Sequence, residues 1–497
     1  FLDAYTLTFA ALLFTFGVLG DRYGRKPALL LGITVFGIAS ALSAYAVGPG
    51  MLIGTRALMA VGGAAVLPST LSIINYVFDA DERGKAIGIW AGVSGLAIAI
   101  GPITGGALLE RFWWGSVFLV NVPLVVVGLF LVWRLVPDSK DPDPQRLDPA
   151  GVLLSIVGLV ALVFGIIRAG ENGSFTDPVA VGSFVGGLVV LGVFWLLERR
   201  SDHPALDVGL FRNRAFSAAS AAVTLAFFAL FGVTFFLTFY LQFARAYSPF
   251  QAGLRLLPVA IAVAVFSPLS SRLVRRFGAK LVASTGLSVV VVAFLLYTQL
   301  QVSSSIWFLE GILFLQGTGL ANTIAPSTTS IQLVLPRERA GAGSAVNNTT
   351  RQIGGALGIA ILGSILSATY SSGLLGSLPD ALPAAARQAA GQSLGAALEV
   401  ARQLPPQLGA ALADPARTAF MHALHVTALA AAGVAALGAL VVAVWLPGRP
   451  DGGDGGSADG ATDTSDTTDT TGSGDRTGER TVDLRGPRQG AGRHRRE

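Results

Sequence analysis

Two long apolar runs are separated by the short polar stretch Gly17-Val18-Leu19-Gly20-Asp21-Arg22-Tyr23-Gly24-Arg25-Lys26-Pro27. This connection holds one acid and three bases and is too short for anything but a tight turn. Bases beside a membrane span favour the cytoplasmic side, and glycines let helices turn and approach closely. The stretch therefore predicts a cytoplasmic hairpin between two membrane helices. Asp21 ends the first helix, an unfavourable place for a charge unless something nearby requires it.

The composition excludes a soluble globular protein. Of 497 residues, 52% are hydrophobic and only 13% are charged, whereas soluble domains carry about 25% charged residues. The mean hydropathy is +0.62. The chain has no cysteine and four histidines, so we expect no disulfide, no thiol chemistry and no metal centre. The small net charge of +5 does not indicate a nucleic-acid partner.

Thirteen apolar runs of membrane-spanning length follow one another along the chain. Cytoplasmic loops are enriched in lysine and arginine. One set of alternate loops holds nineteen of these residues, with Arg351 counted in the loop before the twelfth run, and the opposite short loops hold three. We therefore expect a plasma (inner) membrane protein whose C-terminus is cytoplasmic. The runs are 3–20, 28–46, 51–75, 86–109, 116–134, 150–168, 178–197, 215–241, 253–273, 280–299, 306–333, 352–371 and 421–446.

Three short motifs recur in the same order at a nearly constant offset of 254 to 258 positions. Internal repeats of this kind indicate a duplicated bundle. Eight runs separate the copies, an even number, so both halves have the same orientation. The pairs are Asp21-Arg22-Tyr23-Gly24-Arg25-Lys26 with Arg275-Arg276-Phe277-Gly278-Ala279-Lys280, Pro68-Ser69-Thr70-Leu71-Ser72-Ile73 with Pro326-Ser327-Thr328-Thr329-Ser330-Ile331, and Glu82-Arg83-Gly84 with Glu338-Arg339-Ala340.

The repeat predicts a helix that the first half lacks. Run 253–273 is preceded by 215–241, whereas its counterpart 3–20 has no run before it. Phe1 already begins an apolar run, so we interpret the chain as N-terminally truncated. The expected architecture is all-α, with two six-helix bundles, an inserted two-helix hairpin and thirteen of fourteen spans present. The expected bounds are 1–134 for the first bundle, 135–214 for the hairpin with its linkers and 215–446 for the second bundle.

Two further segments have compositions of their own. Residues 372–420, rich in Ala, Pro and Gln, predict one or two amphipathic helices at the outer membrane face. Residues 447–497 are rich in Gly, Thr, Ser and Asp and then in arginine, and they cannot bury a core. We expect a disordered cytoplasmic tail that solubilises the protein or touches the inner leaflet.

The stretch at Asp21 resembles the signature loop between the second and third helices of the major facilitator superfamily. The layout of six, two and six spans is similar to the fourteen-helix drug:proton antiporters of that superfamily. The resemblance implies that the loop gates the cytoplasmic side; the alternative is a topological loop with a helix-ending Asp21. The gate residues would be Gly17, Gly20, Asp21, Arg22, Gly24, Arg25 and Lys26.

Run 86–109 contains Gly88-x8-Ala97-x3-Gly101-Pro102-x2-Gly105-Gly106, which resembles the antiporter motif of that branch. Ala97 replaces one of the motif's glycines. Small residues permit close helix approach, and a proline frees a backbone carbonyl and permits a bend. The motif favours export over uptake.

Proton coupling needs a carboxyl group that loads and unloads its proton inside the protein. The candidates are Asp3, at the head of the first run, and Glu310, inside 306–333; the alternatives are an interfacial Asp3 and a merely solvated Glu310 with no base beside it. Arg56 is similar to an arginine that the superfamily uses in proton coupling, and the alternative is snorkelling to the outer interface. Near outer helix ends, Arg255 and the His422/His425 pair are explained by interface positions. The proton gradient would be the energy source, without a cofactor.

Run 215–241 carries phenylalanines at helical spacing. Such residues mostly face lipid, and those turned inward would line an apolar, adaptable cavity suited to lipophilic compounds. The candidate cavity residues are Phe231, Phe235, Tyr240 and Asn322. The expected function is proton-coupled efflux of lipophilic drugs or metabolites, cationic ones included, by a monomeric antiporter that confers antibiotic resistance. Its partners would be the small-molecule substrate, protons and the lipid bilayer. Export of a self-made metabolite, export of lipid-like cargo and nutrient symport stay open. An embedded enzyme is disfavoured, because the sequence shows no catalytic constellation.

Overall fold

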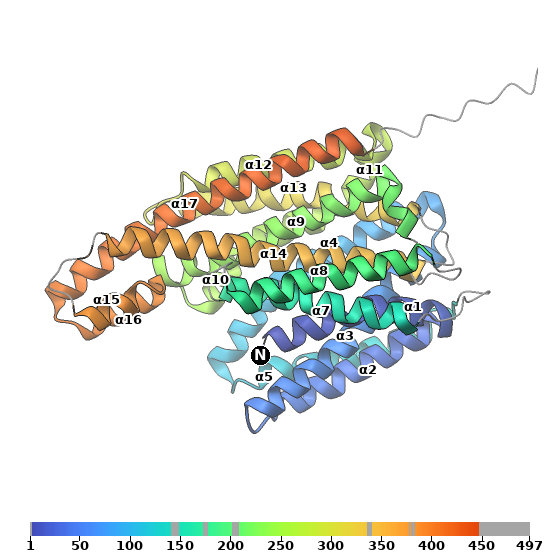
Figure 1. Ribbon diagram of the computed structural model, residues 1–497, viewed down its shortest axis with the longest axis horizontal. Helices are drawn as coiled ribbons and strands as arrows, with labels where there is room; N and C mark the ends of the chain where they lie inside the picture. Colours follow the sequence, from blue (N-terminus) through green and yellow to red (C-terminus); the bar gives the residue numbers. More distant parts are fainter. Residues whose placement is uncertain are drawn as a thin grey trace, which may run out of the picture. The chain divides into compact units, whose positions relative to one another are not determined.

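The elements of the chain are helices throughout the part that the structure describes. The computed structural model describes residues 2–140, 149–171, 177–200, 208–334, 340–376, 378 and 383–446, and these ranges contain no strand. Figure 1 shows the long helices lying side by side along one direction. The predicted all-α class is confirmed.

The first half of the chain forms five helical segments and is followed by a hairpin. The segments are α1 (Leu2–Tyr23), α2 (Arg25–Ala44), α3 (Pro49–Val77), α4 (Ala80–Arg111), and α5 (Ser116–Leu119) with α6 (Asn121–Leu135). The hairpin consists of α7 (Pro149–Glu171) and α8 (Pro178–Glu198). Each apolar run up to residue 197 falls on one of these segments.

The second half contains the helices of the predicted runs and several shorter helices between them. They are η1 (Val208–Arg212), α9 (Arg214–Phe239), the π-helix η2 (Tyr240–Ala244), α10 (Pro249–Arg255), α11 (Leu257–Phe277), α12 (Ala279–Tyr297), α13 (Ile306–Leu333), α14 (Ala340–Leu375), α15 (Ala384–Ala390), α16 (Leu394–Gln403) and α17 (Pro406–Trp445). Side-chain caps set some of the starts. The Asn213 carboxamide accepts hydrogen bonds from the first amides of α9, and Ser248 with Gln251 forms a capping box at α10.

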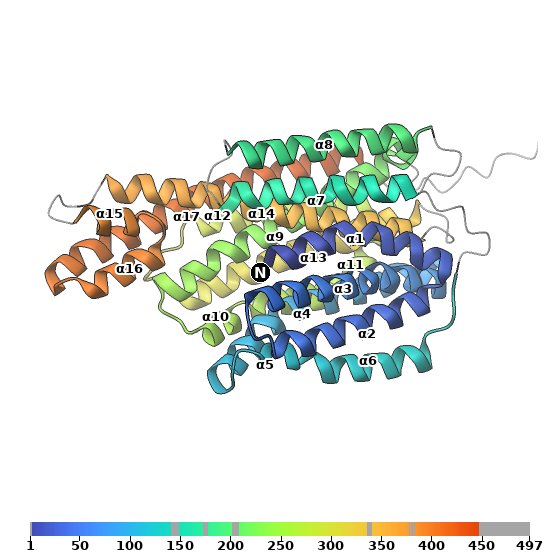
Figure 2. The same cartoon turned by 60° about the horizontal axis from the view of Figure 1, so that its bottom comes forward.

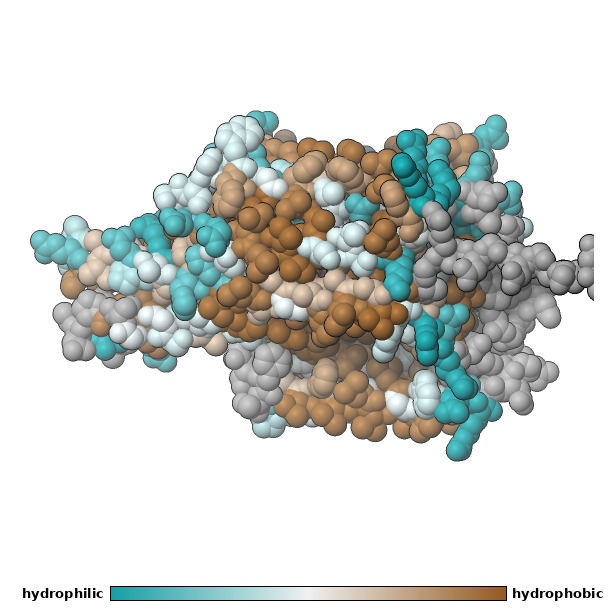
Figure 3. All heavy atoms as spheres, turned by 90° about the horizontal axis from the view of Figure 1, so that it is seen from above, coloured by the Kyte–Doolittle hydropathy of each residue, from teal (hydrophilic) through white to brown (hydrophobic). Residues whose placement is uncertain are grey.

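Ten helical stretches of the described chain are long and apolar enough to cross a membrane. They cover α2, α3, α5 with α6, α7, α8, α9 with η2, α10 with α11, α12, α14 and α17. The other three helices that match predicted runs, α1, α4 and α13, are not among the ten, and the count of thirteen spans stays a prediction. Figure 3 shows hydrophobic residues gathered in a broad belt with hydrophilic residues toward the ends of the helices. The chain is a multi-pass membrane protein.

The two halves build the same turn between corresponding helices. Gly24 joins α1 to α2 with φ +114°, and Gly278 joins α11 to α12 with φ +83°. The two glycines lie 254 positions apart. Because other residues rarely adopt positive φ, glycine is required at both turns.

The halves also share one helix crossing. A Cβ added at Gly62 of α3 would lie 2.6 Å from the carbonyl oxygen of Gly32 on α2. A Cβ added at Gly319 of α13 would lie 2.6 Å from the carbonyl oxygen of Gly286 on α12. In both cases the backbones approach so closely that no side chain fits between them. The sequence repeat thus corresponds to a repeated structure.

The α7–α8 hairpin packs along the seam between the halves. Its own helices approach at Gly165 and Gly187, where an added Cβ would lie 2.6 Å from the Phe184 nitrogen and 2.5 Å from the Leu162 nitrogen, respectively. Leu162 and Ile166 of α7 share a buried cluster with Ala360 of α14, and α7 also contacts α1. Figure 2 shows α8 on the outside of α7.

Several predicted boundaries are wrong in the second half. Helix α14 begins at Ala340 rather than near 352, so Arg351 lies within a helix and not in a cytoplasmic loop. Helix α17 begins at Pro406, so the last fifteen residues of the predicted outer segment 372–420 are continuous with the last helix. The amphipathic helices expected there are α15 and α16, which bury residues such as Leu394 and Ala397. The predicted tail 447–497 lies outside the described residues.

Candidate functional site

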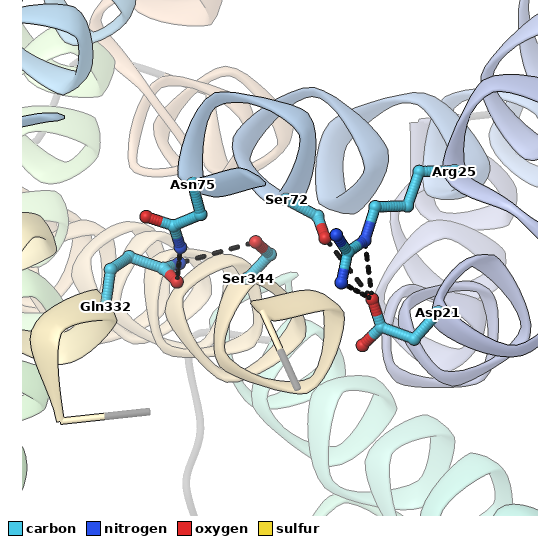
Figure 4. Close-up of polar contacts among 6 residues, drawn as sticks. All are labelled: Asp21, Arg25, Ser72, Asn75, Gln332 and Ser344. Carbon is cyan, nitrogen blue, oxygen red and sulfur yellow. Dashed lines mark hydrogen bonds and ion pairs between the residues drawn. The ribbon is translucent and has the colours of Figure 1, made fainter. Parts of the chain in front are cut away.

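The predicted gate loop is built around a buried ion pair between Asp21 and Arg25. One Asp21 carboxylate oxygen accepts hydrogen bonds from Nε of Arg25 at 2.9 Å and from the Ser72 hydroxyl at 3.3 Å. Arg25 is 1% exposed, and its guanidinium carbon lies 5.6 Å from the centroid of the Tyr76 ring. Asp21 and Arg25 thereby tie the α1–α2 turn to α3 (Figure 4). The other end of the bundle, where α4 ends, carries Glu110; we call the two ends the Asp21 end and the Glu110 end.

The segment after α6 closes over the same loop. The Arg25 amide donates to the carbonyl of Ser139 at 2.9 Å, and the Lys26 ammonium lies 4.0 Å from the Asp138 carboxylate. Gly17 and Gly20 are buried in α1, and Arg22 stacks over Tyr23 at the exposed side of the turn. In the second copy, Arg275 takes the place of Asp21 and is exposed, so the two loops differ in charge and burial.

The two halves meet at the Asp21 end through a polar contact that the sequence did not predict. The Asn75 carboxamide of α3 donates a hydrogen bond to the side-chain oxygen of Gln332 on α13. Gln332 in turn donates to the Ser344 hydroxyl of α14 at 3.3 Å (Figure 4). Asn75 and Gln332 are 2% and 1% exposed. The only sequence signal for them is their place just after the two Pro-Ser-Thr repeats.

Helix α4, which carries the antiporter motif, packs along the second half over most of its length. Added Cβ atoms at Gly88 and Gly106 would lie 2.8 Å from the Ser267 carbonyl oxygen and 2.9 Å from Phe250, so both glycines are needed for contact with α11 and α10. Nothing lies within 4 Å of such an atom at Gly101 or Gly105. The side chain of Pro102 lies outside the described residues. Gly88 and Gly106 of the motif therefore contact the other half, whereas Gly101 and Gly105 face open space.

The halves also touch at the Glu110 end. The Ser248 hydroxyl, before α10, donates to the Glu110 carboxylate of α4 at 3.2 Å. Both ends of the bundle are thus bridged in this state.

Glu310, one of the three proton-coupling candidates, forms an ion pair that the sequence did not predict. Its carboxylate lies 2.7 Å from the guanidinium of Arg255 in α10, and the side chains are 17% and 36% exposed. The absence of a base beside Glu310 was therefore a wrong expectation. Arg255 also lies over the Tyr247 ring at 5.7 Å. The pair joins α10 to α13.

Arg56 lies between two aromatic rings. Its guanidinium carbon lies 5.3 Å from the Tyr5 ring centroid and 5.8 Å from the Phe118 ring centroid. Its Nε is buried without a hydrogen bond to any described residue. The side chain of Asp3 lies outside the described residues, although its position is two residues before Tyr5.

A small, mostly apolar cavity lies between α4, α9, α11 and α13. Gln316 is its most polar lining residue and accepts a hydrogen bond from the Tyr297 hydroxyl at 2.8 Å. The lining from α9 is Leu230, Val233, Thr234 and Leu237, completed by Gly95, Leu256, Val259, Ala260, Leu313 and Gln316. The lining is mainly aliphatic, with Gln316 and Thr234 as its polar side chains, and it includes no phenylalanine of the aromatic run.

The four predicted cavity residues lie elsewhere. Phe231 and Phe235 pack against Gly355 and Gly363 of α14. Tyr240 is 1% exposed and donates its hydroxyl to the Gln301 carbonyl at 2.9 Å. The Asn322 carboxamide donates to the Thr318 carbonyl, and its own oxygen is buried without a partner in the described structure. Their role in a cavity stays a prediction.

No group of acids and histidines in the described ranges is arranged to hold a metal ion. His425 has a structural contact instead, with Nε2 at 2.7 Å from the Leu300 carbonyl oxygen.

A helical membrane bundle of two like halves that are bridged at both ends is the architecture of a transporter of the alternating-access type. Residues 2–359 match the sequence family described as the Major Facilitator Superfamily, and the chain belongs to it.

The chain is similar to curated drug-resistance proteins over most of its length. It is 38% identical to the multidrug efflux pump LfrA of Mycolicibacterium smegmatis over 373 residues, which are 74% of this chain and 73% of that protein. It is 35% identical to the methyl viologen resistance protein SmvA of Salmonella typhimurium over 430 residues, 86% of each chain. It is 38% identical to the puromycin resistance protein pur8 of Streptomyces alboniger, with 73% of each covered.

Among solved structures, the human organic anion transporter MFSD10 matches with a TM-score of 0.58, covering 88% of this chain and 82% of that one. The sequences are 14% identical, so this likeness concerns the fold alone.

Proposed function

We propose that the protein exports lipophilic drugs across the plasma membrane in exchange for protons. The observation that carries this proposal is the α4 interface. Two glycines of the antiporter motif, Gly88 and Gly106, contact the backbone of the opposite half. A rocking motion of two rigid halves must slide or open along this helix. The relatives named for drug efflux and drug resistance support export over uptake. The protein acts as a transporter and not as an enzyme.

The Arg255–Glu310 pair is the proposed proton site. A carboxylate held 2.7 Å from a guanidinium is stabilised in its charged form, and protonation of Glu310 removes that attraction. Because the pair joins α10 to α13, its release loosens the second half near the Glu110 end. Arg56 has no acid among its described contacts and is proposed to tune the field around the first half.

The Asp21 end is proposed to face the cytoplasm, because its loops carry the excess of bases. The Asp21–Arg25 pair and the Asn75–Gln332 contact would then form the cytoplasmic gate, closed in this state. A cytoplasmic C-terminus is part of this proposal. The protein is proposed to work as a monomer, with the cargo, protons and the bilayer as its partners.

Everted membrane vesicles test this function. In vesicles energised by respiration, we expect uptake of a lipophilic dye such as ethidium, abolished by a protonophore, and dye-induced release of protons from the lumen. Vesicles from cells without the protein provide the baseline. Dye accumulation that does not exceed that baseline would refute export, and accumulation that survives the protonophore would refute proton exchange.

A further inference from the structure

Arg351 occupies a cage of two aromatic rings, one from each half of the protein. Its guanidinium carbon lies 5.0 Å from the centroid of the Trp90 ring and 4.3 Å from that of the Phe227 ring. Trp90 belongs to α4 in the first half, whereas Phe227 belongs to α9 in the second. Arg351 itself lies in α14, within the stretch Val346–Leu375 that is apolar enough to cross a membrane. A cation therefore sits between the halves inside the bundle.

The walls of this cage are held by close helix contacts. Gly88 and Gly92 stand two positions before and two positions after Trp90. They bring α4 against the backbone of α11 at Ser267 and Ala264. On the other side, Gly354 of α14 lies against the Thr224 carbonyl of α9, where an added Cβ would clash with the carbonyl oxygen. Phe227 is 4% exposed. The ring positions are thus set by the backbone and not by the guanidinium.

Arg351 has no counter-ion in the described part of the chain. Its polar contact is Nη1 to the Asn348 side-chain oxygen at 3.5 Å, the outer limit of a hydrogen bond. Arg25 and Arg255, by contrast, each pair with a carboxylate at 2.9 and 2.7 Å. A charge inside a membrane protein is unfavourable without compensation, and here the ring faces supply it. The guanidinium is therefore the most weakly held of these three cations.

We propose that the Trp90–Phe227 cage is a binding site for lipophilic organic cations, and that Arg351 occupies it in the empty transporter. This inference rests on the proposed export function and names the class of cargo. Aromatic ring faces bind organic cations in the same way as they bind a guanidinium. A cargo cation displaces Arg351 and takes its place between the rings. Because one ring belongs to each half, exchange of the occupant changes the contact between the halves and couples binding to their movement.

Binding of a matched pair of probes to the purified full-length protein tests the cage. Tetraphenylphosphonium and tetraphenylborate share one shape and carry opposite charges. In Arg351→Gln, which removes the tethered competitor, we expect tetraphenylphosphonium to bind about tenfold more tightly than to the unmodified protein. Unchanged or weaker binding of the cation would overturn the proposal. Loss of tetraphenylborate binding with no gain for the cation would identify an anion site instead.

Ring variants provide an independent readout if Arg351→Gln does not fold. We expect Trp90→Leu and Phe227→Leu to weaken tetraphenylphosphonium binding about tenfold, whereas Trp90→Phe retains most of it. Arg402→Gln, on an exposed arginine of α16, is the matched control and should leave binding unchanged. Equal binding in Trp90→Leu and Trp90→Phe would contradict the cage. Cation binding of the predicted pattern without vesicle transport would refute the export function and leave the cage standing. Vesicle transport together with unchanged tetraphenylphosphonium binding in Arg351→Gln would refute the cage and leave the export function standing.

Discussion

Asn75 of α3 and Gln332 of α13 form a direct hydrogen bond between the two halves of the protein. They follow the two copies of the Pro-Ser-Thr motif and lie 257 positions apart, so equivalent helix ends meet each other across the pseudo-symmetric seam. Both side chains are buried, and Ser344 extends the contact to α14. A buried hydrogen bond of this kind must be broken whenever the Asp21 end opens.

Removing this contact shifts the balance toward the state open at the Asp21 end. In Asn75→Ala, Gln332 loses its donor, and the closed state loses about 1–3 kcal/mol. Because the chain has no native cysteine, single cysteines report accessibility directly. We expect a maleimide to label Ser327→Cys, buried in α13, several-fold faster in the Asn75→Ala background. Equal labelling rates in the two backgrounds would show that the contact does not hold the end closed.

Substitution of the crossing glycines destabilises both halves in the same way. Gly62→Ala and Gly319→Ala each place a Cβ 2.6 Å from a carbonyl oxygen, and the helices must separate. We expect a loss of about 1–3 kcal/mol for each, measured by thermal unfolding in detergent. Gly54→Ala on α3 and Gly311→Ala on α13 meet nothing within 4 Å and serve as controls on the same helices. A loss confined to one half would argue against a shared architecture.

Neutralisation of Asp21 leaves the buried Arg25 without its carboxylate. Breaking a buried ion pair by removal of one partner costs about 3–5 kcal/mol, so Asp21→Asn should lower the unfolding temperature markedly. Arg275→Gln, at the corresponding exposed place in the second half, should have little effect. Comparable losses for the two variants would contradict the asymmetry of the loops.

Glu310→Gln should uncouple transport from the proton gradient. The neutral side chain mimics the protonated state and cannot cycle, so the variant can equilibrate cargo but not accumulate it. Exchange of one monovalent cation for one proton moves no net charge, so the pH gradient is the drive. A difference of about 1.7 pH units supplies about 2.3 kcal/mol per proton, which corresponds to about 50-fold accumulation. We expect this accumulation to disappear in energised vesicles, while Glu399→Gln, on an exposed acid of α16, retains it. Accumulation by Glu310→Gln at the unmodified level would exclude Glu310 as the proton site.

Local chemistry made part of the fold predictable. Gly24 and Gly278 stand in matching motifs, and a tight turn with positive φ leaves few other choices. Hydropathy located the helices but not the start of α14, because the polar residues Ser344 and Asn347 are buried between helices and Arg351 is half-buried between aromatic rings. A polar segment and a loop have the same hydropathy, and only packing distinguishes them.

The pairings of the candidate site could not be predicted from sequence. Glu310 and Arg255 lie 55 positions apart on different helices, and their contact depends on how α10 returns to α13. Tyr240 and Phe235 lie on an aromatic run that could face the cavity or the neighbouring helix. The depth and rotation of α9 against α14, set by Gly354 and Gly358, decide between these faces.

A reversible cross-link at the seam tests the central claim most directly. In the double variant Asn75→Cys/Gln332→Cys, a short bis-methanethiosulfonate linker should join the two halves at the Asp21 end. We expect the linked protein to stop dye efflux and a reductant to restore it, while either single cysteine treated in the same way stays active. Efflux at the full rate by the fully linked protein would contradict alternating access by movement of the two halves.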